Sequence, residues 1–275
     1  MLTNVHNWVL RELLRRKGKE DKDLSIYLYN IAPDSLPMHK DISAKLTHKI
    51  TLSKELLKKH PKLIFVKYHL MVDNLGHYGL LTCPKGINNN FEKEGYAYIK
   101  GRSLIEEVKK FYQEGREWST VHSPQSVDEN SALYLAHTAV EIALDLKLSE
   151  EDESITSLFF ALQGSLTPQA LEEYYQSLAE LYNLRPETIR EAREAPLKFY
   201  GEPKSKEDFF LDKRVKIILR KSKREFTREN IDKAKRLVIK GERLLTDYLP
   251  TLEDWVKKIE LASIEEEETL SSDEP

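Results

Sequence analysis

The sequence predicts an all-α protein, a bundle of many helices. Glycine and proline number only 10 and 11 among 275 residues, which disfavours a loop-rich β-sandwich and favours long helices. Most of the chain consists of segments whose apolar residues recur every three or four positions, the spacing of an amphipathic helix. Some of these segments start at residues that cap helices, such as Thr167 followed by Pro168, and Thr227.

The N-terminal quarter of the chain is predicted to hold several short helices. The first covers residues 3–17 and ends at a glycine, and a shorter one follows over residues 22–31. Two nearby prolines then place Asp34 in a rigid turn. Residues 48–60 are ambiguous, although a serine could cap a helix there. The proline that follows them suits the first turn of a helix over residues 61–76.

The rest of the chain is predicted to be helical apart from one long loop and the end. Residues 82–101 predict a loop with one short strand over 96–99, because glycine, proline and three consecutive asparagines interrupt the helical pattern. Residues 265–275 are acidic and poor in apolar side chains, which is typical of a disordered tail. Helices are predicted over residues 103–114, 127–146, 150–163, 167–183, 186–194, 206–222, 227–248 and 250–264.

Composition limits the class of protein. The formal net charge is only −3, which argues against a surface that coats nucleic acid. A single cysteine excludes an intramolecular disulfide and fits a reducing compartment. The N-terminus does not have the pattern of a signal peptide, and no apolar run approaches the roughly 20 residues of a membrane span. We therefore expect a cytoplasmic protein without a transmembrane segment, and its oligomeric state is left open.

Two stretches place metal-binding side chains one helical turn apart. His69, Asp73 and His77 follow one another at four-residue steps, and His137 and Glu141 repeat that step. Residues four apart share one face of a helix, and imidazole and carboxylate groups are ligands that zinc accepts. A single histidine on an apolar face is more often a core residue than a ligand. The combination of two such rows nevertheless predicts a buried metal site.

The order of these residues along the chain resembles that of the zinc-dependent phospholipase C family, whose fold is shared with single-strand-specific zinc nucleases. The resemblance covers about residues 1–145. It implies a helical domain that encloses a cluster of two or three zinc ions, or other divalent metals. One ion would be held by Asp34, His48, His69 and Asp73, a second by His77, His137 and Glu141, and a third by His6, with Asp73 as the bridge to the first.

The resemblance also implies the reaction. We expect a hydrolase that cleaves a phosphodiester or phosphomonoester through a metal-bound hydroxide, with Asp34 and Asp73 as catalytic residues through the ions they hold. The expected substrate is a small phosphorylated molecule or a lipid headgroup. We accordingly divide the chain into a metal-binding domain over residues 1–200, charged helices over 201–264 that could pack on it, and the acidic tail over 265–275.

Other features leave alternatives open. Residues 213–243 are strongly basic and could bind an anionic partner, which would suit a non-enzymatic helical scaffold with a structural metal. We favour a solvated face balanced by the acidic tail, and nucleic acid is not the favoured partner.

Asp145 could support the metal ligands one turn before it, but a solvated position is the preferred interpretation. A phosphohydrolase with adjacent His-Asp pairs is disfavoured, because the sequence contains no such dipeptide. Surface positions are expected for the other histidines, His39, His60 and His122.

Overall fold

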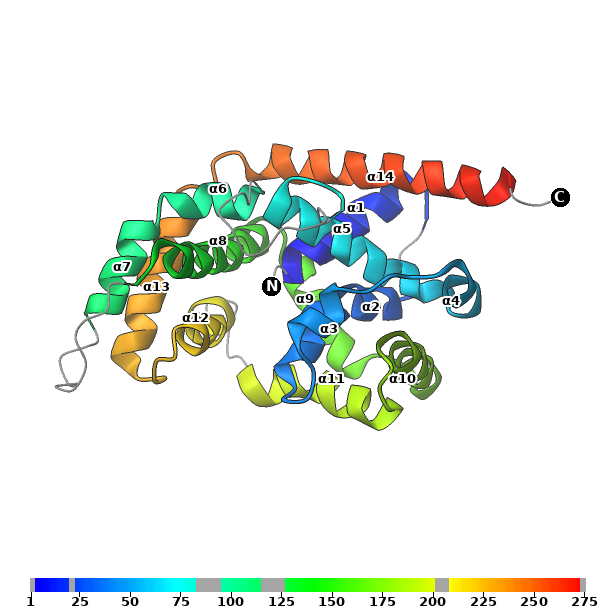
Figure 1. The fold of residues 1–275 in the computed structure, drawn as a ribbon, viewed down its shortest axis with the longest axis horizontal. Helices are drawn as coiled ribbons and strands as arrows, with labels where there is room; N and C mark the ends of the chain where they lie inside the picture. The colour runs from blue at the N-terminus through cyan, green and yellow to red at the C-terminus, as the bar shows by residue number, and fades with distance from the viewer. Residues whose placement is uncertain (1–2, 20–22, 83–94, 115–126, 201–207, 273–275) are drawn as a thin grey trace. The chain divides into compact units, whose positions relative to one another are not determined.

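The structure is a computed structural model that describes residues 3–19, 23–82, 95–114, 127–200 and 208–272. These residues form helices joined by turns and contain no strand (Figure 1). The prediction of an all-α, multi-helix protein is confirmed. Within the described residues, every helix is too short or too polar to cross a membrane.

The chain forms two compact units, each assembled from segments far apart in the sequence. The α1 unit comprises Thr3–Asp73, Ser154–Phe199 and Asp247–Pro275, and the α8 unit comprises Met1–Leu2, Asn74–Glu153 and Tyr200–Thr246. The units therefore interleave along the chain, whereas the sequence predicted a division at residue 200. The difference arises because helices distant in sequence share one core.

The α1 unit is built around α1, whose buried face carries Val5, Val9 and Leu13. In Figure 1, α14 runs alongside α1. Serine and threonine side chains cap its helices, as when Ser53 accepts a hydrogen bond from the backbone of Leu56. The helices of this unit are α1 (Thr3–Arg16), α2 (Ser25–Ser35), η1 (Leu36–Met38), α3 (Ala44–His48), α4 (Lys54–Lys59), η2 (Pro61–Leu63), the first part of α5 (Ile64–Tyr78), α9 (Glu153–Gly164), α10 (Pro168–Tyr182), α11 (Pro186–Tyr200) and α14 (Tyr248–Ser272).

The α8 unit is built around α8 (Glu129–Glu151), which is buried along most of its length. Asp128 caps this helix by accepting a hydrogen bond from the backbone of Ser131. α6, α7 and α13 pack against it (Figure 1). The unit also contains the end of α5, α6 (Tyr96–Arg102), α7 (Ile105–Gln113), the π-helix η3 (Asp208–Arg214), α12 (Lys216–Lys221) and α13 (Arg228–Glu242).

Three local predictions are wrong. Residues 96–99 belong to the helix α6, because Ala97, Tyr98 and Gly101 form a helical face that is buried against α8. Asp34 lies in the last turn of α2, not in a turn outside a helix, since the fixed φ of proline is compatible with the helical conformation there. The backbone of α14 continues as a helix to Ser272, where a disordered tail was expected.

Gly101 allows α6 to lie close to the backbone of α8. A methyl group at this position would lie 3.0 Å from the backbone nitrogen of His137 and 3.2 Å from its Cα. We therefore expect Gly101→Ala to lower the free energy of unfolding by about 1–3 kcal/mol, the usual effect of overpacking, in a urea titration. Gly164→Ala is the control, because nothing lies within 4 Å of the added methyl group. An unchanged stability of the Gly101 variant would contradict this close packing.

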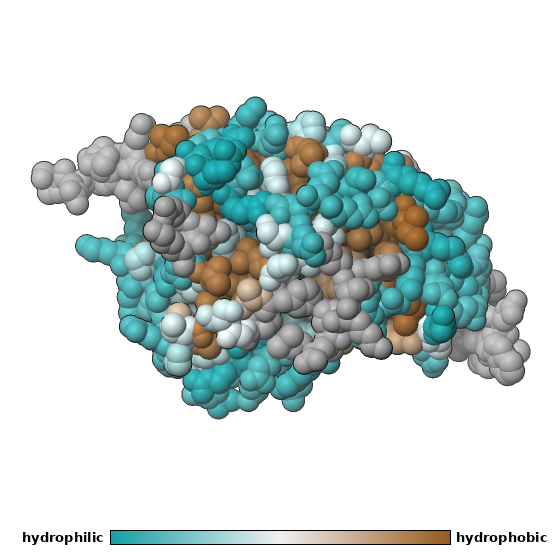
Figure 2. Space-filling view, turned by 180° about the vertical axis from the view of Figure 1, so that it is seen from behind, coloured by the Kyte–Doolittle hydropathy of each residue, from teal (hydrophilic) through white to brown (hydrophobic). Residues whose placement is uncertain are grey.

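Exposed apolar side chains are distributed over many segments. The face shown in Figure 2 has hydrophobic residues interspersed among hydrophilic ones. Single exposed apolar residues are common and need no partner to explain them. Among the described residues, the large exposed apolar side chains are Leu80, Ile99, Tyr134, Phe226, Ile239, Leu261 and Ile264.

Candidate metal centres

The first cluster of metal-binding side chains lies inside the α1 unit. Four helices contribute to it: α1 carries His6, α2 carries Asp34, α3 carries His48, and α5 carries His69 and Asp73. The four-residue step on α5 places its two residues on one face, as the sequence predicts. The two groups of ligand atoms that form here share His69, and within each group the atoms lie within 4.8 Å of one another.

The two carboxylates of this cluster each face the same two imidazoles. Nε2 of His48 lies 3.5 Å from Oδ1 of Asp34 and 3.5 Å from Oδ2 of Asp73. Nε2 of His6 lies 3.9 Å from the other oxygen of each carboxylate, Oδ2 of Asp34 and Oδ1 of Asp73. The ring of His69 stacks on His6 with centroids 3.8 Å apart. Each aspartate therefore has one carboxylate oxygen towards His6 and the other towards His48.

These separations suit ligands arranged around a cation. Zinc binds nitrogen and oxygen at about 2.0–2.2 Å, so two of its ligands in a tetrahedral site are roughly 3.3–3.5 Å apart. Neither ring nitrogen of His6 or His69 has a hydrogen-bond partner among the described residues, although all four nitrogens are buried. Burying polar groups without partners is costly, and a bound cation would supply a partner for one nitrogen of each ring. The residues present thus fit a metal ion.

The charge states of the histidines agree with this arrangement. Burial lowers the pKa of His69 to about 4 and holds the pKa of His6 well below its usual value. Burial would also lower the pKa of His48, but Asp34 and Asp73 outweigh it and raise that pKa to about 9. The first two imidazoles are therefore neutral and able to coordinate a cation, while the carboxylates favour a positive charge beside them.

A backbone contact orients His48 towards the carboxylates. Its Nδ1 lies 2.9 Å from the carbonyl oxygen of Ala44. Because a carbonyl oxygen only accepts, Nδ1 carries the proton and donates, so Nε2 faces Asp34 and Asp73. Contacts of this kind fix the orientation of metal-binding histidines in many proteins. The adjacent Thr47 donates its hydroxyl hydrogen bond to the carbonyl oxygen of Pro33, 2.8 Å away, which joins α3 to the end of α2.

The second cluster lies inside the α8 unit. Nε2 of His77, on α5, lies 2.8 Å from Oε1 of Glu141, and Nε2 of His137 lies 3.9 Å from the same oxygen. Glu141 and His137 are both buried on α8, and burial holds the pKa of His137 well below its usual value. The ring of Tyr98 stacks on His137 with centroids 4.2 Å apart. Two imidazoles and one carboxylate equal the three protein ligands of a catalytic zinc site.

The eight ligands predicted from the sequence thus fall into two clusters, five residues in the α1 unit and three in the α8 unit. That they bind metal stays a prediction. The remaining histidines have other partners: His39 lies 3.5 Å from Glu191, and His60 lies 2.9 Å from Glu180. His122 and Cys83 lie outside the described residues.

The interpretation of Asp145 as a solvated residue is wrong. Asp145 is fully buried and forms an ion pair with Arg214 of η3, which is also buried. This aspartate lies one turn after Glu141 on α8, so its pairing fixes η3 against the helix that carries two candidate ligands. The apolar neighbours Leu144 and Leu146 were the signal in the sequence that this position is buried.

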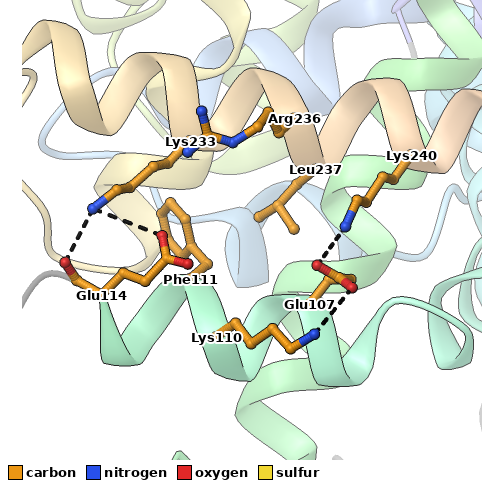
Figure 3. Close-up of a pocket in the computed structure, with 8 residues that line it drawn as sticks. All are labelled: Glu107, Lys110, Phe111, Glu114, Lys233, Arg236, Leu237 and Lys240. Atoms are coloured by element: carbon orange, nitrogen blue, oxygen red, sulfur yellow. Dashed lines mark hydrogen bonds and ion pairs between the residues drawn. The ribbon is translucent and has the colours of Figure 1, made fainter.

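The basic segment, residues 213–243, is balanced by acidic residues of its own unit. Figure 3 shows the pocket between α7 and α13, where Lys240 pairs with Glu107 at 2.5 Å and Lys233 contacts Glu114. Lys235 pairs with an aspartate of η3 at 2.6 Å. The carboxylates that pair with these lysines come from neighbouring helices. The segment therefore offers less positive charge to an external anion than its composition indicates.

Comparisons of the chain with protein-family models, with curated proteins and with solved structures found no match.

Proposed function

We propose that the protein is a metal-dependent hydrolase that acts on a phosphoester, with zinc as the expected metal. The observation that carries the proposal is the buried pair His6 and His69, whose ring nitrogens have no hydrogen-bond partner among the described residues and which lie beside two carboxylates. A second cluster of two imidazoles and a carboxylate adds to this support. The order of the ligands, which resembles that of zinc-dependent phospholipase C, supports the reaction class.

The residues of the two clusters would each have a definite role. Asp34, His48, His69 and Asp73, with His6, would hold metal in the α1 unit, and His77, His137 and Glu141 would hold metal in the α8 unit. A divalent ion supplies Lewis acidity, which lowers the pKa of a bound water and offsets the charge of a phosphoester. The protein side chains provide the ligands, keep the imidazoles of His6, His69 and His137 neutral through burial, and orient His48 through its contact with Ala44.

A scaffold that uses its basic segment to bind an anionic partner is the second candidate. The structure offers this candidate less support, because Lys233, Lys235 and Lys240 are already paired with carboxylates. The two functions differ in a measurable way. A structural metal is held by a closed set of ligands and produces no turnover, whereas a catalytic metal keeps a position for water.

The proposed activity can be tested on the full chain purified without added metal. Elemental analysis gives the number of ions per chain, and turnover is measured on p-nitrophenyl phosphate, bis-p-nitrophenyl phosphate and phosphatidylcholine vesicles with and without a chelator. Two or more divalent ions per chain and turnover that the chelator abolishes would support the proposal. Bound metal without turnover of any of these substrates would favour the scaffold.

Removal of metal is expected to lower thermal stability. A ligand present at 1,000 times its Kd stabilises the fold by about 4 kcal/mol, and each kcal/mol shifts the Tm of a domain of this size by roughly 2–4 °C. We therefore expect a chelator to lower the Tm by about 10 °C, as followed by circular dichroism, and added zinc to restore it. A Tm that is the same with and without chelator would contradict metal binding in the buried clusters.

A further inference from the structure

Lys221, on α12, contacts the part of α8 that carries two candidate ligands of the cluster in the α8 unit. Its Nζ donates a hydrogen bond to Oγ1 of Thr138, 2.8 Å away, and lies 4.5 Å from the centre of the Tyr134 ring. Positions 134, 137, 138 and 141 share one broad face of α8, since 137 and 138 lie three and four residues after 134 and likewise four and three residues before 141. Two of these positions carry the candidate ligands His137 and Glu141. The lysine therefore borders the cluster.

The surroundings of Lys221 differ from those of other lysines in the basic segment. Lys233, Lys235 and Lys240 each have a carboxylate oxygen within 2.8 Å of Nζ. Among the residues that the structure describes, Lys221 has no such partner within 4 Å. Its ammonium is held instead by a hydroxyl group and an aromatic face. Neither of these neutralises its charge.

The position of this charge matters because a metal ion is proposed beside it. An ammonium next to a divalent cation is repelled, and the repulsion is strong where water is partly excluded. The charge of Lys221 also contributes to the low pKa of His137, after burial and against the opposing effect of Glu141, so the two groups are electrostatically coupled. An anion bound between the lysine and the metal would offset both positive charges.

The chemistry of the site indicates which anion fits. An ammonium group is a common binder of phosphate, which it attracts as a point charge. Of its three N–H donors, one is directed to Thr138. Tyr134, whose ring lies beside this lysine, is 47% exposed, so the site can be reached from solvent at this side.

We propose that Lys221 is a substrate-binding residue of the α8 unit, which takes a phosphate oxygen of the phosphoester. Thr138 and Tyr134 position its ammonium, while His77, His137 and Glu141 would hold the metal ion. The inference rests on the proposed function, which supplies the metal and the substrate class. It adds the residue that recognises the anion.

The test measures binding of inorganic phosphate to the metal-loaded full chain by isothermal titration calorimetry. For Lys221→Met we expect the Kd to rise about tenfold or more, the contribution of a hydrogen bond to a charged group. Lys221→Arg, which keeps the charge, should bind within about threefold of the unchanged protein. Metal content is measured for each protein, so that a loss of phosphate binding is not confused with a loss of metal.

Lys216→Met is the matched control. Lys216 lies on the same helix and its Nζ is 6.0 Å from the centre of an aromatic ring, that of Phe226, so the substitution removes a similar lysine with a similar neighbour. We expect its phosphate Kd to be unchanged. If Lys216→Met weakens binding as much as Lys221→Met does, the effect is one of overall charge and the proposal is overturned.

The remaining outcomes separate this inference from the proposed function. Tight phosphate binding by Lys221→Met, together with turnover by the unchanged protein, would overturn the role of Lys221 and leave the phosphoesterase standing. Phosphate binding that depends on Lys221, without turnover of any phosphoester, would support the role of Lys221 and contradict the proposed reaction. If Lys221→Met fails to fold, the phosphate Kd is measured for Thr138→Val, which leaves the lysine in place but removes the hydroxyl that positions it. A higher Kd would support the role of Lys221, and an unchanged Kd would overturn it.

Discussion

Replacing Asp73 by alanine is expected to remove at least one metal ion from the chain and to lower kcat/KM for a phosphoester by more than about 100-fold. This carboxylate faces two imidazoles at once, with Oδ1 towards His6 and Oδ2 towards His48. Its loss would therefore remove a carboxylate ligand from beside both His6 and His48. Removal of a group that only supports a ligand already decreases metal affinity or activity by about 10–100-fold, so removal of a ligand itself should exceed that range.

Elemental analysis and turnover measured on the same preparation check this expectation. Asp254→Ala is the control, since Asp254 belongs to the same unit but pairs with Lys258 at the surface; its metal content and turnover should be unchanged. Asp34→Ala should resemble Asp73→Ala, because Asp34 faces the same two histidines with its own two oxygens. Full metal content in the Asp73 variant would show that this residue is not a bridging ligand.

The sequence predicts best what depends on neighbours along the chain. The four-residue step between His69 and Asp73 requires only that α5 is a helix, and the step between His137 and Glu141 requires the same of α8. Long segments of regular apolar spacing also gave the correct fold class. Boundaries shifted by a few residues, as when α8 ends at Glu151 and not near residue 146.

The convergence of separate helices could not be derived from spacing. His6, Asp34 and His48 lie on three helices, and only the resemblance to a known ligand order indicated that they meet. The same limit explains the wrong strand over residues 96–99: its glycines indicate a loop until the close approach of Gly101 to α8 is known. Tertiary packing, which no local pattern records, decides such positions.

Charge patterns were the least informative part of the sequence. Residues 213–243 form one basic segment by composition, yet the structure gives its members different surroundings. Arg214 is buried against a carboxylate, Lys240 is paired at the surface of α7, and Lys221 lies beside the candidate ligands. A count of charges cannot separate these cases, because burial and the presence of a counter-ion depend on which helices meet.

The buried pair Asp145 and Arg214 leads to the second large effect. Replacing Asp145 by alanine leaves the Arg214 guanidinium, only 1% exposed, without the carboxylate that balances it. Breaking a buried ion pair in this way typically costs about 3–5 kcal/mol. We therefore expect Asp145→Ala to lower the free energy of unfolding by that amount in a urea titration, and Arg214→Met to have a similar effect for the same reason.

Two comparisons distinguish the buried charge from a simple loss of contacts. Lys147→Ala breaks another ion pair of α8, with Glu242 at 3.6 Å, but both of its partners are partly exposed, so the expected loss is below about 1 kcal/mol. The double variant Asp145→Leu with Arg214→Met removes both buried charges and should be more stable than either single variant, because no unpaired charge is left. Equal losses in the single and double variants would mean that packing, not charge, accounts for the stability that this pair contributes between η3 and α8.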